Sequence, residues 1–172
     1  MTAANGGNRR GWHSLTAHYA PGEERPLGAY AVLASAYVAG TGGALLGIRV
    51  CGRRLPEHPS AADVLLLGVA THKLSRLLTK DRVTSFLRAP FTRFQGPGGP
   101  GEVEEEAYGD GLREAVGELL ICPYCLGQWV ATGFTLGLVS APRLTRLLSS
   151  ILAVHTVSDV LQIAYRASEG AL

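Results

Sequence analysis

The feature that most constrains this chain is a long stretch without charge in its second half. No charged residue occurs between Glu118 and Arg143. The run from Leu119 to Ala141 is therefore long enough for one helix to cross a lipid bilayer, which takes about 20 apolar residues. The sequence thus predicts an integral membrane protein with at least this one span.

The composition agrees with a small membrane bundle. At 172 residues the chain has room for one domain, or for a helix bundle with a tail. Charged residues make up only 17%, and glycine, with 22 residues, is frequent, as in membrane helices that approach each other closely. A net charge of +2, with no basic run interleaved with aromatic residues, argues against a nucleic-acid partner.

Three further segments are predicted to be membrane helices. Residues 27–48 carry no charge and form the first predicted span, in which Gly43 and Gly47 have the small-xxx-small spacing of close helix contacts. The second span starts near residue 62; it begins apolar and ends in basic residues that can reach the headgroups. The last apolar segment, 147–165, follows the central stretch. Residues 1–26, which precede all of them, are expected to form a flexible polar tail.

The chain between the second and third spans is predicted to stay outside the hydrocarbon region. Residues 81–94 are expected to form a short interfacial amphipathic helix, with Phe86 on its apolar face and Arg82 and Arg88 on its flanks. The Gly/Pro-rich segment and the acidic run after it predict a polar loop over 95–112. Its clustered glutamates can bind a cation, but a solvated loop is the expectation. The predicted fold is therefore all-α: a multi-pass transmembrane bundle of about four spans, three of them within residues 62–166.

The distribution of basic residues predicts the orientation of this bundle. Four spans place both termini and the middle loop on one side, and that side carries more Lys and Arg than the other. The positive-inside rule then predicts a cell-membrane protein with cytoplasmic N- and C-termini. The polar groups of the spans gather at the cytoplasmic end.

The central stretch begins with a CxxC pattern, Cys122-Pro123-Tyr124-Cys125. Two thiolates at this spacing can ligate zinc or another soft divalent metal, and His155 is the candidate for a further ligand. A helix N-terminus also favours redox-active thiol chemistry. The alternative is that both cysteines are small packing residues, since free cysteine is often buried. The pattern alone leaves these readings open.

Asp159 in the last span needs a partner, because an ionised side chain within a membrane is costly. Arg76 of the second span is the expected partner for an intramembrane ion pair, with Lys73 or His155 as alternatives. Such a pair can fix the helix register or serve an ion pathway in a small transporter. Two aromatic residues near the same end are predicted interface anchors: Tyr124 and Trp129.

Several of these patterns occur together in a known family. The stretch HKLSRLLTKDRVTSFLRAPF, the acidic segment and then GELLICPYCLGQWVA resemble a family of small bacterial membrane proteins catalogued as domain of unknown function 1360. The resemblance covers roughly residues 62–164 and implies a multi-pass membrane location, without an activity. The positions that carry it are Arg76, Leu77, Asp81, Arg88, Pro90, Gly117, Glu118, Leu119, Cys122, Pro123, Cys125, Gly127 and Trp129. CPYC is also the tetrapeptide of glutaredoxins, but the apolar helices predicted after it argue against that fold.

No nucleophile–base arrangement or phosphate-binding glycine loop occurs in the sequence, so we expect a protein that is not an enzyme. The expected function is that of an accessory or scaffold protein in the bilayer, which engages a membrane or cytoplasmic partner or a second copy of itself. The alternative is a thiol or metal-binding site at the cytoplasmic membrane face, built on Cys122 and Cys125.

Overall fold

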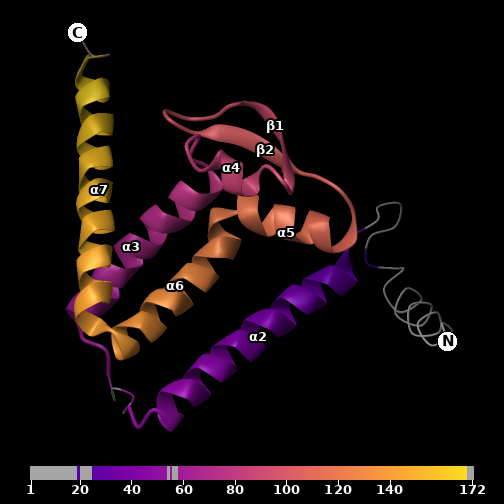
Figure 1. The fold of residues 1–172 in the computed structure, drawn as a ribbon. Coiled ribbons are helices and arrows are strands. Elements are labelled where there is room, and N and C mark those ends of the chain that lie inside the picture. Colours follow the sequence, from indigo (N-terminus) through magenta and orange to yellow (C-terminus); the bar gives the residue numbers. More distant parts are fainter. Residues whose placement is uncertain (1–18, 20–24, 54, 56–57, 170–172) are drawn as a thin grey trace, which may run out of the picture.

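The structure is a computed structural model and describes residues 19, 25–53, 55 and 58–169. Most of the predicted tail, 1–26, lies outside these residues. The described chain is mostly helical, with one small sheet (Figure 1). Its elements, in chain order, are α2 (Leu27–Val50), α3 (Ala61–Thr79), α4 (Ser85–Arg88), β1 (Thr92–Pro97), β2 (Val103–Ala107), α5 (Gly111–Ile121), α6 (Pro123–Ser140) and α7 (Pro142–Glu169).

The helix α3 is the centre of the packing, because it contacts both α6 and α7. Among the side chains that α3 buries, two are small: Ala70 is 0% exposed and Ser75 is 4% exposed. On α7, Ser149 is also fully buried. Small residues let helix backbones approach closely, which is the way membrane helices pack. The α2 helix diverges from this group and contacts α5 and α6 (Figure 1).

Two helices in the described part of the chain, α2 and α7, are long and apolar enough to cross a membrane, and the pair α5–α6 adds a third if it counts as one span. The helix α3 does not meet this criterion, because charged residues interrupt it, among them Asp63 and Lys73. The structure therefore supports two or three of the four predicted spans by length and composition.

The sequence predicted one continuous helix over the central stretch, and the structure shows two. It breaks at Cys122, and α5 and α6 meet there at an angle of 81°. Cys122 has extended backbone angles (φ −103°, ψ 104°), which suit a residue that precedes a proline. Pro123 then occupies the first turn of α6, where a missing N–H costs nothing. We call this junction the elbow.

A β-hairpin replaces the predicted polar loop, and the fold is therefore not all-α. The expected interfacial helix over 81–94 is also wrong, since α4 is a single turn and the chain then enters β1. The strands β1 and β2 pair antiparallel, with Thr92 opposite Ala107. The Gly/Pro-rich segment forms the turn between them, and Gly101 takes a positive φ of +80° that favours glycine. Turn chemistry, rather than linker flexibility, explains the composition of this segment.

The helix α5 packs directly on the open end of the hairpin. Gly117 makes this approach possible, because a Cβ atom there would lie 2.5 Å from the Phe91 carbonyl oxygen and 3.1 Å from the Ala107 Cβ. Ala115, on the same helix, is 1% exposed. We call residues 81–121, which comprise α4, β1, β2 and α5, the polar cap. It covers the end at which α3 finishes and α6 begins (Figure 1).

Candidate functional site

Arg88 is the centre of the polar cap and is 0% exposed. Its guanidinium donates to a carboxylate, a hydroxyl and two main-chain carbonyls: Glu105 Oε2, Thr84 Oγ1 (2.9 Å), Leu78 O (2.8 Å) and Asp81 O (3.0 Å). A buried guanidinium is stable only when its donors find such partners. The expectation that Arg88 lines the flank of an interfacial helix is wrong, because the end of α3 and the hairpin enclose it.

The acidic run is not a solvated loop, because three of its glutamates pair with basic residues in α3, at the end of α3 and in α4. The pairs are Glu102 with Arg76 (2.5 Å), Glu104 with Lys80 (3.0 Å) and Glu105 with Arg88. The main chain joins the same segments, since the Val103 N–H donates to the Lys80 carbonyl at 2.9 Å. The hairpin is thus held to the end of α3 by charge and by backbone hydrogen bonds together.

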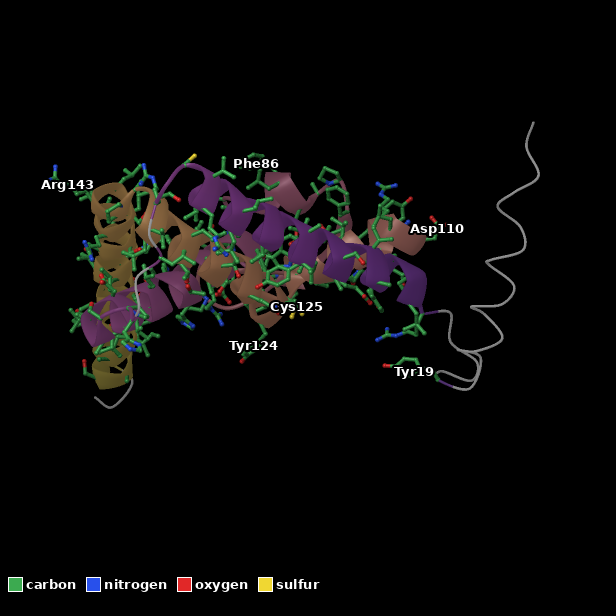
Figure 2. All side chains as sticks on the ribbon, turned by 90° about the horizontal axis from the view of Figure 1, so that it is seen from below. Tyr19, Phe86, Asp110, Tyr124, Cys125 and Arg143 are labelled. Atoms are coloured by element: carbon green, nitrogen blue, oxygen red, sulfur yellow. The ribbon has the colours of Figure 1, made fainter. Side chains whose placement is uncertain are left out.

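At the elbow, the Cys122 thiol has a structural contact. Its Sγ accepts a hydrogen bond from the Cys125 backbone N–H at 3.2 Å and so caps the first turn of α6. Both cysteines are free; Cys122 is half-buried and Cys125 is exposed. In Figure 2, Cys125 and Tyr124 lie on the side of the molecule opposite Phe86. Because Cys125 is exposed, its thiol at least is accessible to a ligand.

The predicted metal ligands do not come together. Among the described residues, no group of three or more His, Cys, Asp or Glu side chains is close enough to hold a metal ion. His155 lies on α7, where its Nε2 is 3.7 Å from the Asp159 Oδ1. The two cysteines therefore lie close together at the elbow, but His155 does not complete a ligand group with them.

The two predicted anchors differ in their surroundings. Tyr124 is 90% exposed and projects away from the helices (Figure 2). Trp129 packs edge-to-face on Tyr37 of α2, with ring centroids 5.1 Å apart. The Tyr37 hydroxyl also forms a 2.7 Å hydrogen bond with Thr132 Oγ1. Trp129 therefore joins α2 to α6, a contact that the sequence did not indicate.

Asp159 pairs with Lys73, at 2.5 Å between Nζ and Oδ2, and not with the expected Arg76. The reason is that Arg76 is drawn to Glu102 of the hairpin. A second pair, which the sequence analysis missed, joins the beginnings of α3 and α7: Arg146 donates to both oxygens of Asp63, at 2.8 and 3.0 Å. One pair joins the beginnings of the two helices and the other joins residues further along both. The chain therefore runs in the same direction in α3 and α7.

A cavity of about 450 Å³ lies between α3, α7 and the hairpin turn. It is lined by charged side chains of both signs: Lys73, Arg76 and Arg166, with Asp81, Glu102 and Asp159. Apolar residues of α7 complete its wall, including Val160 and Ile163. This cavity brings together more ionisable groups than any other place described above, and it is the candidate ligand site of the protein.

These features define a class of protein: helices of membrane-spanning length, joined by an elbow at a CxxC pattern and covered at one end by a polar cap with a buried arginine. Residues 66–165 match the model of the family described as "Protein of unknown function (DUF1360)", and the chain belongs to this family. The resemblance predicted from the sequence is thereby confirmed.

Two relatives come from Bacillus subtilis (strain 168). UPF0713 protein YngL is 30% identical over 109 residues, which cover 63% of this chain and 82% of that protein. Sporulation protein YjcA is 29% identical over 102 residues, which cover 58% of this chain and 86% of that protein. No solved structure matches the chain significantly.

Proposed function

We propose that this protein is a non-enzymatic accessory or scaffold protein of the cell membrane, which associates through α2 with a second copy or with another membrane protein. The observation that carries the proposal is the unused small-residue face of α2. A Cβ atom added at Gly40, Gly43 or Gly47 would meet nothing within 4 Å. Glycines at this spacing serve close helix contacts, and nothing in the described chain takes that place.

The proposed topology has four spans, with α3 as the second. Two charged side chains of α3 are directed to α7, so that Asp63 is 12% and Lys73 is 15% exposed. The side chains that α3 leaves exposed near its start are apolar, with Val64 at 55% and Leu65 at 71%. Lipid tolerates a polar helix whose charges are paired with a neighbour. The polar cap and both termini are placed on the cytoplasmic side by the positive-inside rule.

The charges of the polar cap support a structural role over a catalytic one. Glu102, Glu104 and Glu105 are held in ion pairs, and the buried Arg88 donates four hydrogen bonds to its own chain. Groups used in this way hold a fold together and have no capacity left for proton transfer. A rigid cap on a membrane bundle is well suited to present a fixed surface to a partner.

Replacing both Gly43 and Gly47 by leucine is the test of this proposal. We expect the double variant to lose most cross-linking to its partner in native membranes, because leucine side chains prevent close approach of a neighbouring helix. Its level in the membrane should stay unchanged, since a Cβ atom added at either position meets nothing within 4 Å in the chain. Gly28→Leu, at the beginning of the same helix, is the matched control. Equal cross-linking of all three proteins, or a wild-type protein without any cross-link, would contradict the proposal.

A thiol or metal site at the elbow is the second candidate function, favoured by the exposed Cys125 next to the half-buried Cys122. Zinc needs four ligands, so the two thiolates would be completed by groups from a second copy or a partner. Metal analysis of protein purified without added metal is the measurement. On this reading, wild-type protein holds stoichiometric metal and the Cys122→Ser/Cys125→Ser variant holds none. Serine can cap a helix as well as the thiol does, so folding is preserved. Metal-free wild-type protein would exclude a metal site at the elbow.

A further inference from the structure

We propose that the cavity between α3, α7 and the hairpin turn binds the headgroup of a zwitterionic phospholipid, one that carries a phosphate and an ammonium group. The inference rests on the membrane location proposed above and adds a ligand to it. It is carried by the charges inside the cavity, by the apolar surface at its edge and by its place in the fold.

Within the cavity, four of the six charged groups neutralise each other. Lys73 pairs with Asp159, and Arg76 pairs with Glu102, both at 2.5 Å. The two that remain have opposite signs: in the described part of the chain, neither Arg166 nor Asp81 forms an ion pair. One oxygen of Asp81 accepts the Val83 N–H at 2.7 Å, which fixes the orientation of the carboxylate.

A ligand that satisfies both groups must itself carry both charges. Arg166 offers a planar set of donors that suits a phosphate, and Asp81 offers an acceptor that suits an ammonium group. A purely anionic headgroup would engage Arg166 and leave Asp81 facing a like charge. The cavity therefore favours a zwitterionic headgroup over an anionic one.

The apolar wall of the cavity indicates a lipid. Val160 is 60% exposed and Ile163 is 68% exposed, although both line the cavity. Further exposed apolar side chains continue along the same helix, among them Val157 and Leu161. In the proposed topology this surface of α7 faces lipid, so the acyl chains of a bound headgroup can leave the cavity along it.

The position of the cavity agrees with this assignment. It lies where the apolar part of α3 has ended and the polar cap begins, between residues of α3 and the hairpin turn on one side and α7 on the other. In the proposed topology this is the level of the cytoplasmic headgroups. Basic and aromatic side chains are usual at this depth, and the one available charge of each sign matches the two charges of a zwitterionic headgroup.

The test is native mass spectrometry of the full chain, purified in detergent and incubated with equal amounts of phosphatidylethanolamine and phosphatidylglycerol. We expect phosphatidylethanolamine to be retained about tenfold more, the effect of one charge-assisted hydrogen bond. Arg166→Gln should lower its retention about tenfold. Asp81→Asn, which keeps the acceptor for Val83, should remove the preference between the two lipids. Arg143→Gln, which removes a charge from the other end of α7, is the matched control and should behave as wild type (Figure 2).

Equal retention of both lipids by the wild-type protein would overturn the inference, and so would equal losses in Arg166→Gln and Arg143→Gln. Competition with water-soluble glycerophosphoethanolamine distinguishes a lipid from its headgroup alone. If the soluble compound binds as tightly as the lipid, the acyl contacts are not used and the lipid assignment fails. Membrane fractionation separates this outcome from failure of the proposed function: a protein that stays in the membrane without lipid preference refutes only the headgroup site.

Discussion

Arg88→Met is expected to lower the free energy of unfolding by about 3–5 kcal/mol, because it leaves a buried carboxylate without its partner. Glu105 is only 5% exposed, and Arg88 is its counter-ion. The same substitution also removes the donors that hold the carbonyls of Leu78 and Asp81. Thermal unfolding in detergent, followed by circular dichroism, measures the loss, and limited proteolysis should show cleavage in the hairpin first.

Two further variants isolate the cause. Arg82→Met removes an exposed charge from the segment just before α4 and should change stability by less than about 0.5 kcal/mol. Arg88→Met/Glu105→Leu should recover a large part of the loss, since an apolar pair can replace a buried ion pair. If Arg88→Met were no less stable than Arg82→Met, the guanidinium would not support the polar cap.

Gly117→Ala should destabilise the polar cap by about 1–3 kcal/mol, the usual cost of overpacking. The added methyl group would meet the Phe91 carbonyl oxygen at 2.5 Å, and a main-chain atom cannot move aside without shifting β1. Thermal unfolding again gives the magnitude, and hydrogen exchange of the hairpin amides should locate the change at the contact between α5 and the two strands.

Gly133→Ala is the control for this substitution. It lies inside α6, where an added Cβ meets nothing within 4 Å, so alanine should be neutral or should stabilise the helix by up to about 1 kcal/mol. The contrast separates steric conflict from helix propensity. Similar behaviour of the two variants would mean that α5 does not rest on the hairpin as closely as the structure shows.

The positions of the long helices could be predicted from the sequence, because an uncharged run of sufficient length is a strong local signal. The elbow was missed although its signal was present. Pro123 restricts the residue before it to extended angles, and Cys122 adopts them. The run of apolar residues outweighed a single proline in the prediction, whereas in the structure the proline decides where α5 ends.

The hairpin was harder to predict, because its stability comes from distant partners. Glycine and proline between Phe94 and Glu102 are typical of a linker and of a turn alike. The glutamates distinguish the two only through residues that lie 17 to 26 positions away in the chain. Charge runs carry no information about such pairing, so a solvated loop was the natural expectation.

The partner of Asp159 shows the same limit at the candidate site. Lys73 and Arg76 lie about one turn apart on α3, and either can reach α7. The choice is made by Glu102, which engages Arg76 and leaves Lys73 for Asp159. A prediction that treated the second and the last spans without the hairpin could place the partner of Asp159 on the correct helix, α3, but not on the correct residue.

The parallel pairing of α3 with α7 has a consequence for biosynthesis. Asp63 and Lys73 acquire their counter-ions only after 83 and 86 further residues have been made. At roughly 5–20 residues per second, α3 waits about 4 to 17 s for α7 to emerge. During that interval its charges are unpaired, and entry into lipid is costly. In the proposed topology, α3 therefore leaves the translocation machinery late, and the two helices enter the bilayer together as a neutralised pair.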